Sequence, residues 1–164
     1  GDGDDYKKLL TKMRDKIPGL ALRTTFMVGF PGETDEQFEN LCSFVKDIKF
    51  DKMGCFTFSP EEDTPAFDMD NQIDDEVKNR RQEVLMDIQY TITEQSNKGR
   101  VGNKYKVIID SFDGEKYIGR SYMDSPEIDS GIIFTSDKPL NIGEFCNVLI
   151  TDFDGYDLIG ECVE

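Results

Sequence analysis

Two kinds of hydrophobic spacing divide the chain into an N-terminal part and a C-terminal part. Up to about residue 97, apolar side chains recur mostly at intervals of three and four residues, which is typical of helices that bury one face. From Lys104 onward they recur every second residue, which is typical of short strands. The pattern predicts two domains, residues 1–97 and 98–164, with their boundary at Lys98–Gly102.

The N-terminal part is predicted to form a helix and then a strand–helix–strand unit. The first helix, Tyr6–Ile17, ends at Pro18-Gly19, and side chains alternate along residues 20–28 as in a strand. Thr34 and Gln37 have the spacing of a capping box. The apolar face of the next helix is formed by Phe38, Leu41, Cys42, Val45 and Ile48. A second strand follows Lys52, and such a unit joins parallel strands.

A polar loop and a long helix complete this part. Residues 59–73 contain two prolines and five acidic side chains, and are predicted to be a solvated surface connection. The helix is predicted over residues 74–97, with acidic side chains at its N-terminus. Its expected buried stripe consists of Val77, Val84, Leu85, Ile88 and Ile92.

The C-terminal part is predicted to be a small β-barrel. Its five strands are expected at Tyr105–Ile109, Tyr117–Tyr122, Ile132–Phe134, Phe145–Ile150 and Leu158–Val163. Asp113-Gly114 and Asp154-Gly155 supply tight turns, and Gly119 indicates a bend within a strand. Five antiparallel strands with this spacing predict an oligonucleotide-binding-like barrel. Its aromatic residues are interpreted as core rather than as platforms for bases: Phe112, Tyr117, Tyr122, Phe134 and Phe153.

The run Gly29–Glu33, Gly-Phe-Pro-Gly-Glu, connects the first predicted strand to its helix. Glycines beside a proline turn the backbone sharply and leave room for a ligand. Ligands bind parallel sheets at this end of the strands, but the same turn also serves as a simple connection. Neither the phosphate-loop pattern nor the Gly-x-Gly-x-x-Gly dinucleotide pattern is present.

Several runs resemble one enzyme family in order and spacing. Arg23–Thr25, Gly29–Thr34 and Ser59–Ala66 are similar to the barrel of the radical S-adenosylmethionine methylthiotransferases. Tyr122–Asp129, Tyr-x-Asp-x-Pro-Glu-Ile-Asp, is similar to the RimO-type branch of that family. The resemblance covers nearly the whole chain.

The resemblance implies an α/β plus all-β fold: the C-terminal portion of a radical S-adenosylmethionine (β/α) barrel, incomplete and closed by helix 74–97, followed by a TRAM domain. It implies an enzyme that adds a methylthio group to the β-carbon of an aspartate of a small-subunit ribosomal protein. The cofactors would be S-adenosylmethionine and two 4Fe–4S clusters. Of the residues matched, those expected near S-adenosylmethionine are Arg23, Val28, Gly29, Glu33 and Phe58. Those expected near the substrate are Arg120, Tyr122, Asp124, Glu127 and Asp129. An ion pair with one of the many acidic side chains is the alternative role for Arg23.

The cysteines limit what this chain does alone. Cys42, Cys55, Cys146 and Cys162 lack the spacing of iron–sulfur ligands, and there is no histidine. We expect the cysteines to be small buried hydrophobes. The chain is therefore predicted to hold no metal and to supply no catalytic acid, base or nucleophile, and to be an inactive fragment whose parent relies on its cofactors. Residues 1–5 are interpreted as a cut end.

The formal net charge of −15 indicates a basic partner. Residues 98–164 alone carry 7 basic and 13 acidic side chains, a net charge of −6. TRAM domains of related tRNA-modifying enzymes are understood to bind RNA, which requires a positive surface. Only a small patch is available here, formed by Lys98, Arg100, Lys104 and Lys106. We therefore expect a basic ribosomal protein as partner, with tRNA unlikely, no membrane contact and a cytoplasmic location.

Two other functions remain open at this point. A tRNA methylthiotransferase would use the same barrel on an adenosine, with the TRAM domain holding RNA. A non-enzymatic binding module would explain the incomplete barrel, although an unfinished parallel sheet leaves an exposed edge.

Overall fold

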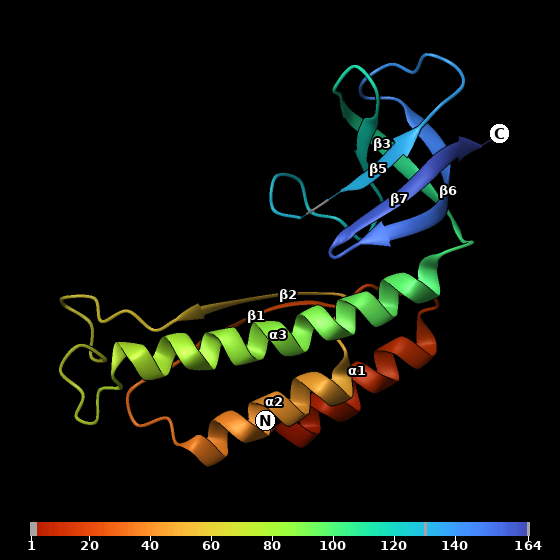
Figure 1. The fold of residues 1–164 in the computed structure, drawn as a ribbon. Coiled ribbons are helices and arrows are strands. Elements are labelled where there is room, and N and C mark those ends of the chain that lie inside the picture. The colour runs from red at the N-terminus through yellow and green to blue at the C-terminus, as the bar shows by residue number, and fades with distance from the viewer. Residues whose placement is uncertain (1–2, 130, 164) are drawn as a thin grey trace. The chain divides into compact units, whose positions relative to one another are not determined.

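The computed structural model describes residues 3–129 and 131–163, which form two compact units (Figure 1). The first is Gly1–Ile92 and the second is Thr93–Glu164. The division falls inside the long helix α3 (Asp75–Arg100), upstream of the Lys98–Gly102 boundary that the sequence predicts. The last turns of α3 therefore belong to the second unit.

The first unit contains α1 (Gly3–Lys16), β1 (Arg23–Val28), α2 (Asp35–Ile48), β2 (Lys52–Thr57) and most of α3. The two strands pair in parallel, in register from Arg23 with Lys52 to Val28 with Thr57, as predicted. The three helices lie on the same side of this two-stranded sheet (Figure 1). Helix α1 begins at Gly3, earlier than predicted, with Asp4 and Asp5 in its first turn, where the helix dipole favours negative charge.

Alternation along the strands separates a covered face of the sheet from an open one. Val28 and Met53 point toward the helices and are buried, and Phe26 packs against the same core. Met27 and Phe56, on the opposite face, are 44% and 48% exposed. The core is completed by Leu22, Cys42, Val45, Ile48, Phe50, Leu85 and Ile92. The period of two along β1 thus gives one face to the core and leaves the other uncovered.

The capping box that the sequence predicts is present at the start of α2. The backbone N–H of Gln37 donates to the Thr34 hydroxyl, and the backbone N–H of Thr34 donates to the Gln37 side chain, at 3.2 and 3.0 Å. At the other end Lys49 has a φ of 54° and donates its N–H to the carbonyl of Val45. Cys42, Val45 and Ile48 are buried, so the predicted apolar face is confirmed.

The buried face of α3 differs from the prediction. Val77 and Val84 are each 39% exposed, so their assignment to the buried stripe is wrong. Lys78, Arg81 and Gln89 are instead 5%, 6% and 1% exposed. The physical reason is that α3 crosses backbone carbonyls that no strand partner satisfies, and buried carbonyls need donors. Gln89, for example, donates its side-chain N–H to the carbonyl of Phe50 at 2.9 Å.

The second unit is a closed five-stranded barrel with strand order β3-β4-β5-β7-β6 (Figure 1). Its strands are β3 (Lys104–Phe112), β4 (Tyr117–Arg120), β5 (Ile132–Thr135), β6 (Phe145–Asp154) and β7 (Asp157–Val163). All pairs are antiparallel except β5 with β7, which run in parallel. The expectation of a wholly antiparallel barrel is therefore wrong. Because β6 returns to pair with β3, β7 is left to close the barrel beside β5.

The barrel interior is filled by alternating apolar side chains. The buried set is Val107, Ile109, Tyr117, Ile132, Phe134, Val148, Ile150 and Leu158. Phe112, Tyr117 and Phe134 form a stack with successive ring centroids 4.5 and 5.6 Å apart. The core interpretation is confirmed for Tyr117 and Phe134, but Phe112 and Tyr122 are 46% and 66% exposed.

The barrel closes tightly because two glycines allow neighbouring strands to approach. A Cβ added at Gly119 would lie 2.4 Å from the carbonyl oxygen of Ile108, and one at Gly160 would lie 2.4 Å from that of Leu149. We expect Gly119→Ala and Gly160→Ala each to lower the free energy of unfolding of this unit by about 1–3 kcal/mol. Urea denaturation followed by circular dichroism measures the change.

Gly99→Ala is the matched control for both variants. Gly99 lies in α3, and outside its chain neighbours and the helix's own backbone no heavy atom lies within 4 Å of the added Cβ, so alanine should stabilise slightly. Equal losses in all three variants would contradict the close-approach explanation.

Candidate functional site

The turn from Gly29 to Thr34 lies where β1 and β2 both end. Gly29 and Gly32 have φ values of 78° and 83°, a region that favours glycine. The N–H of Phe58 donates to the carbonyl of Val28 at 2.8 Å, which keeps the two strand ends together. Within the turn the N–H of Glu33 donates to the carbonyl of Phe30 at 2.9 Å.

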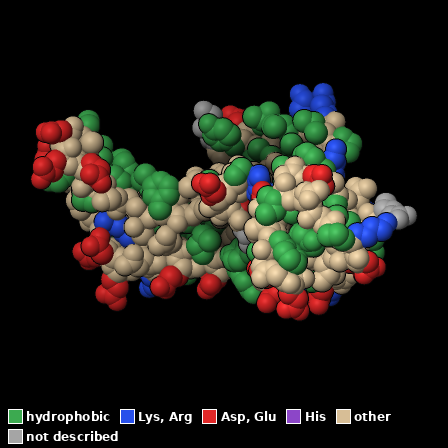
Figure 2. Space-filling view, turned by 90° about the horizontal axis from the view of Figure 1, so that it is seen from above, with side chains coloured by type: hydrophobic (Ala, Val, Ile, Leu, Met, Phe, Trp, Pro, Cys, Tyr) green, Lys and Arg blue, Asp and Glu red, His purple; other side chains and the backbone are tan. Residues whose placement is uncertain are grey.

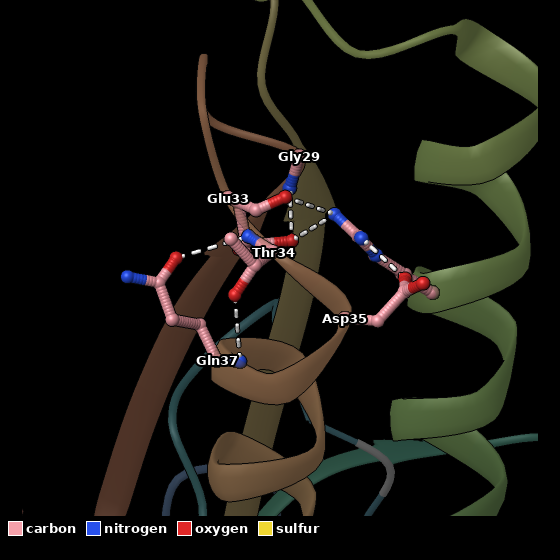
Figure 3. A network of polar contacts seen from close by, with 6 residues as sticks. Gly29, Glu33, Thr34, Asp35 and Gln37 are labelled. Carbon is pink, nitrogen blue, oxygen red and sulfur yellow. Dashed lines mark hydrogen bonds and ion pairs between the residues drawn. The ribbon is translucent and has the colours of Figure 1, made fainter.

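A polar network centred on Glu33 fixes the turn (Figure 3). Its Oε1 accepts from the N–H of Gly29 at 3.0 Å and from the Arg81 guanidinium at 2.7 Å. The same guanidinium donates to the Glu33 carbonyl at 3.2 Å and to Asp35 Oδ1 at 2.8 Å. The side chains of Arg81 and Glu33 are only 7% and 15% exposed. Removing Arg81 would leave the nearly buried Glu33 carboxylate without a cation, whereas removing Glu33 would leave Arg81 with Asp35 as its remaining anion.

The residues expected near S-adenosylmethionine fall into two groups. Val28, Gly29, Glu33 and Phe58 lie together at the carboxyl ends of the strands. Arg23 begins β1 beside Lys52, at the opposite end, about 16 Å away along a strand of this length. The carboxylate of Glu33 is engaged within the turn, where it accepts from the N–H of Gly29 and from Arg81.

Three residues at this edge were not found by sequence reasoning. Phe30 is 42% exposed and meets the Phe58 ring edge-on, with centroids 5.2 Å apart. Lys78 and Arg81 come from α3. Their spacing could have indicated both: Lys78, Arg81 and the buried Leu85 and Gln89 follow one another at intervals of three and four residues, so they share one face of the helix.

The expected substrate residues lie on and beside β4 in the second unit. Asp124 Oδ2 accepts from the N–H and the hydroxyl of Ser121 at 2.9 and 2.8 Å. Asp129 Oδ2 accepts from the N–H of Ser125 at 2.6 Å. Glu127, with a φ of 61°, and Ile128, which is 74% exposed, form the outward tip of the loop. The two aspartates thus hold the loop, and Glu127 presents its charge to solvent.

Arg120 and Tyr122 line a separate groove of about 440 Å³. Its other charged and aromatic residues are Lys104, Lys106, Tyr105 and Phe145. Asp110 forms two hydrogen bonds with Arg120, at 2.6 and 2.9 Å, and these raise the pKa of the guanidinium. Acidic side chains are nonetheless spread over the face shown in Figure 2, where Lys and Arg are fewer.

Cys42 is buried and Cys55, Cys146 and Cys162 are half-buried, so the expectation of buried cysteines is confirmed for Cys42 alone among the four. Burial raises the pKa of the Cys55 thiol to about 11 and, with the neighbouring Cys162, raises that of Cys146 to about 12. Among residues 3–129 and 131–163, no group of three or more His, Cys, Asp and Glu side chains is placed to hold a metal ion. The cysteines present therefore do not fit an iron–sulfur cluster, which needs thiolates gathered at one place.

The second unit matches a known domain family. Residues 101–163 match the TRAM domain family, so the closed barrel is a TRAM domain.

Relatives that match nearly the whole chain all bear one name. It is 48% identical over 155 residues to the ribosomal protein uS12 methylthiotransferase RimO of Caldanaerobacter subterraneus, covering 94% of this chain and 35% of the relative. It is 44% identical over 164 residues to the RimO protein of Cytophaga hutchinsonii, covering 99% and 38%, respectively. The RimO protein of Clostridium botulinum is 47% identical over 156 residues, covering 95% and 35%. The chain therefore corresponds to the C-terminal part of the RimO-type methylthiotransferases and spans a little over a third of their length.

Alanine substitutions at the two glycines of the turn test how closely the Lys78 side chain packs against Gly29. A Cβ added at Gly29 would lie 2.3 Å from Cγ of Lys78, whereas one at Gly32 would meet nothing within 4 Å. Gly32→Ala should therefore lower the free energy of unfolding only by the cost of placing alanine at a positive φ, about 1–2 kcal/mol. Gly29→Ala should lower the free energy of unfolding by about 1–3 kcal/mol more than Gly32→Ala does, because the Lys78 side chain must move. Thermal and urea unfolding measure both variants, and equal losses would show that Lys78 does not constrain Gly29.

The Cys55 thiol is predicted to react slowly. Only the thiolate is alkylated, and a pKa of about 11 leaves little thiolate at pH 8. We expect iodoacetamide to label Cys55 at least about tenfold more slowly in the folded chain than in urea at pH 8. The folded-state rate should still rise between pH 8 and pH 10, as measured by peptide mass spectrometry. A plateau near pH 8.5 would contradict the raised pKa and the half-buried placement of Cys55.

Proposed function

We propose that this chain is the C-terminal part of a radical S-adenosylmethionine methylthiotransferase that adds a methylthio group to the β-carbon of an aspartate of ribosomal protein uS12. The observation that carries the proposal is the 44–48% identity, along 94–99% of the chain, to proteins that bear this name. The turn at Gly29 and the TRAM domain would contribute to two different steps: holding the cofactor and docking the substrate.

The strand ends at Gly29 and Phe58 would form part of the S-adenosylmethionine pocket. Support comes from the two glycines without side chains and from the exposed ring of Phe30 beside them. S-adenosylmethionine supplies the radical and methyl chemistry in such enzymes, and the protein supplies binding and orientation. The cysteines of this chain do not fit a cluster, so both 4Fe–4S clusters of the proposed enzyme would require ligands from outside it.

The TRAM domain would dock the basic uS12 protein. Support comes from its net charge of −6 and from the loop 121–129, whose tip carries Glu127 beside the exposed Ile128. Such an enzyme would work on ribosomes or their free proteins in the cytoplasm. In the described residues, no helix combines the length and apolarity that crossing a membrane requires.

One observation favours the competing tRNA methylthiotransferase. The groove of Lys104, Lys106, Arg120, Tyr122 and Phe145 combines cations with aromatic rings, as RNA-binding surfaces do. Its positive charge is partly offset by Asp110, and the acidic balance of the unit opposes a polyanion. The uS12 proposal therefore has the stronger electrostatic support.

The docking role predicts a salt-dependent loss when the loop is neutralised. In the full-length enzyme, Asp124→Asn, Glu127→Gln and Asp129→Asn together should lower the association rate for uS12 about threefold or more at low salt. Each surface pair contributes about 0.2–1 kcal/mol, and Asp124 and Asp129 also hold the loop. The difference should shrink as salt rises. Surface plasmon resonance across a salt series measures it.

A matched control removes the same charge elsewhere in the unit. Glu115→Gln, Asp137→Asn and Glu161→Gln together change three exposed side chains outside the loop. If both triple variants bind uS12 alike, the loop is not the docking surface. If the unaltered domain binds tRNA more tightly than uS12, the tRNA alternative replaces the proposal.

A further inference from the structure

Lys78 and Arg81 are two cations on one face of α3 that are withdrawn from solvent. Lys78 is 5% exposed and Arg81 is 6% exposed, whereas the adjacent Arg80 is exposed. Burying a charge is unfavourable unless it is paired and hydrogen-bonded. Both side chains contact the backbone at the edge formed by the two strand ends, and neither contact follows from the packing of an apolar helix face.

Lys78 joins the two strand ends through a single side chain. Its ammonium donates to the carbonyl of Phe58, the residue after β2, at 3.2 Å, and pairs with Asp75 at 2.9 Å. Its aliphatic stem lies so close to Gly29, the residue after β1, that a Cβ there would come within 2.3 Å of it. The ammonium is also 5.9 Å from the centre of the Phe58 ring.

Arg81, one turn further along α3, holds the far side of the turn. It donates to both the carbonyl and the carboxylate of Glu33 and to the carboxylate of Asp35 in the first turn of α2. Its guanidinium lies 5.6 Å from the centre of the Phe38 ring. Because Glu33 in turn accepts the N–H of Gly29, the two cations restrain the turn from both ends.

We infer that Lys78 and Arg81 are positioning residues that hold the Gly29–Glu33 turn and the Phe58 carbonyl in the arrangement that binds S-adenosylmethionine. The inference rests on the proposed function for the identity of the ligand. Glu33 acts with these two cations, because its carboxylate is engaged by Arg81 and Gly29. The cations act through the backbone that they hold.

Hydrogen exchange on the 164-residue chain tests the restraint without any ligand. Lys78→Met keeps most of the stem beside Gly29 and removes the ammonium, and Arg81→Met removes the guanidinium. Each should speed amide exchange at Gly29 and Glu33 at least tenfold, while amides in the barrel strands β3 and β6 stay unchanged. Arg80→Met removes the same charge from the exposed side of α3 and should leave the turn amides unchanged.

Conservative variants keep the test decisive if a methionine variant fails to fold. Arg81→Lys and Lys78→Gln each retain a donor, and should give exchange rates between those of the unaltered chain and the methionine variants. Exchange at Gly29 and Glu33 that is unchanged in the folded variants overturns the restraint.

Ligand binding by the full-length protein tests the second half of the inference. We expect Lys78→Met and Arg81→Met to raise the Kd for S-adenosylmethionine at least tenfold in calorimetry, with partial recovery in Arg81→Lys and no change in Arg80→Met. If the unaltered protein binds S-adenosylmethionine and the variants bind it equally well, the positioning role is overturned while the proposed function stands. If the unaltered protein binds none, the proposed function fails and the exchange result alone decides the restraint.

Discussion

The arrangement of the first unit depends on how α3 satisfies backbone carbonyls at the ends of a two-stranded sheet. Such a short sheet leaves carbonyls beyond its ladder, and buried carbonyls require donors. Gln89 donates to Phe50, Lys78 to Phe58 and Arg81 to Glu33. Polar side chains thus share the covered face of α3 with Leu85 and Ile92. The helix is therefore held against the turn by hydrogen bonds as well as packed on the core.

The second unit solves a different problem, because closing a barrel with five strands requires backbones to approach each other closely. Gly119 and Gly160 each face a carbonyl oxygen of the neighbouring strand, at distances that no side chain tolerates. The order β3-β4-β5-β7-β6 lets every strand pair on both sides, so the unit has no free sheet edge. The outer surface is then available for recognition, with an acidic loop at 121–129 and a groove lined by Arg120 and Tyr122.

These two units have different electrostatic roles in the proposed enzyme. At the turn of the first unit, the charges of Arg81 and Glu33 are withdrawn from solvent and paired, and they shape the turn. In the second, charges such as that of Glu127 stay exposed, where they act over distance and are screened by salt. Asp124 and Asp129 fall between these cases, since they carry charge and also hold the loop through the N–H groups of Ser121 and Ser125.

The sequence by itself determined much of this structure. The capping box of Thr34 and Gln37 and the hairpin turns at Asp113 and Asp154 follow from neighbouring residues, and the parallel β1–β2 pair follows from the strand–helix–strand order. The carboxyl-edge site was also foreseeable, because Gly29 and Gly32 follow a strand. Tertiary structure alone decided that β5 and β7 run in parallel, and that Lys78 and Arg81 are buried in place of Val77 and Val84. Hydrophobic spacing cannot show these, because the need for a buried cation arises only when another segment brings an unpaired carbonyl or carboxylate to the helix.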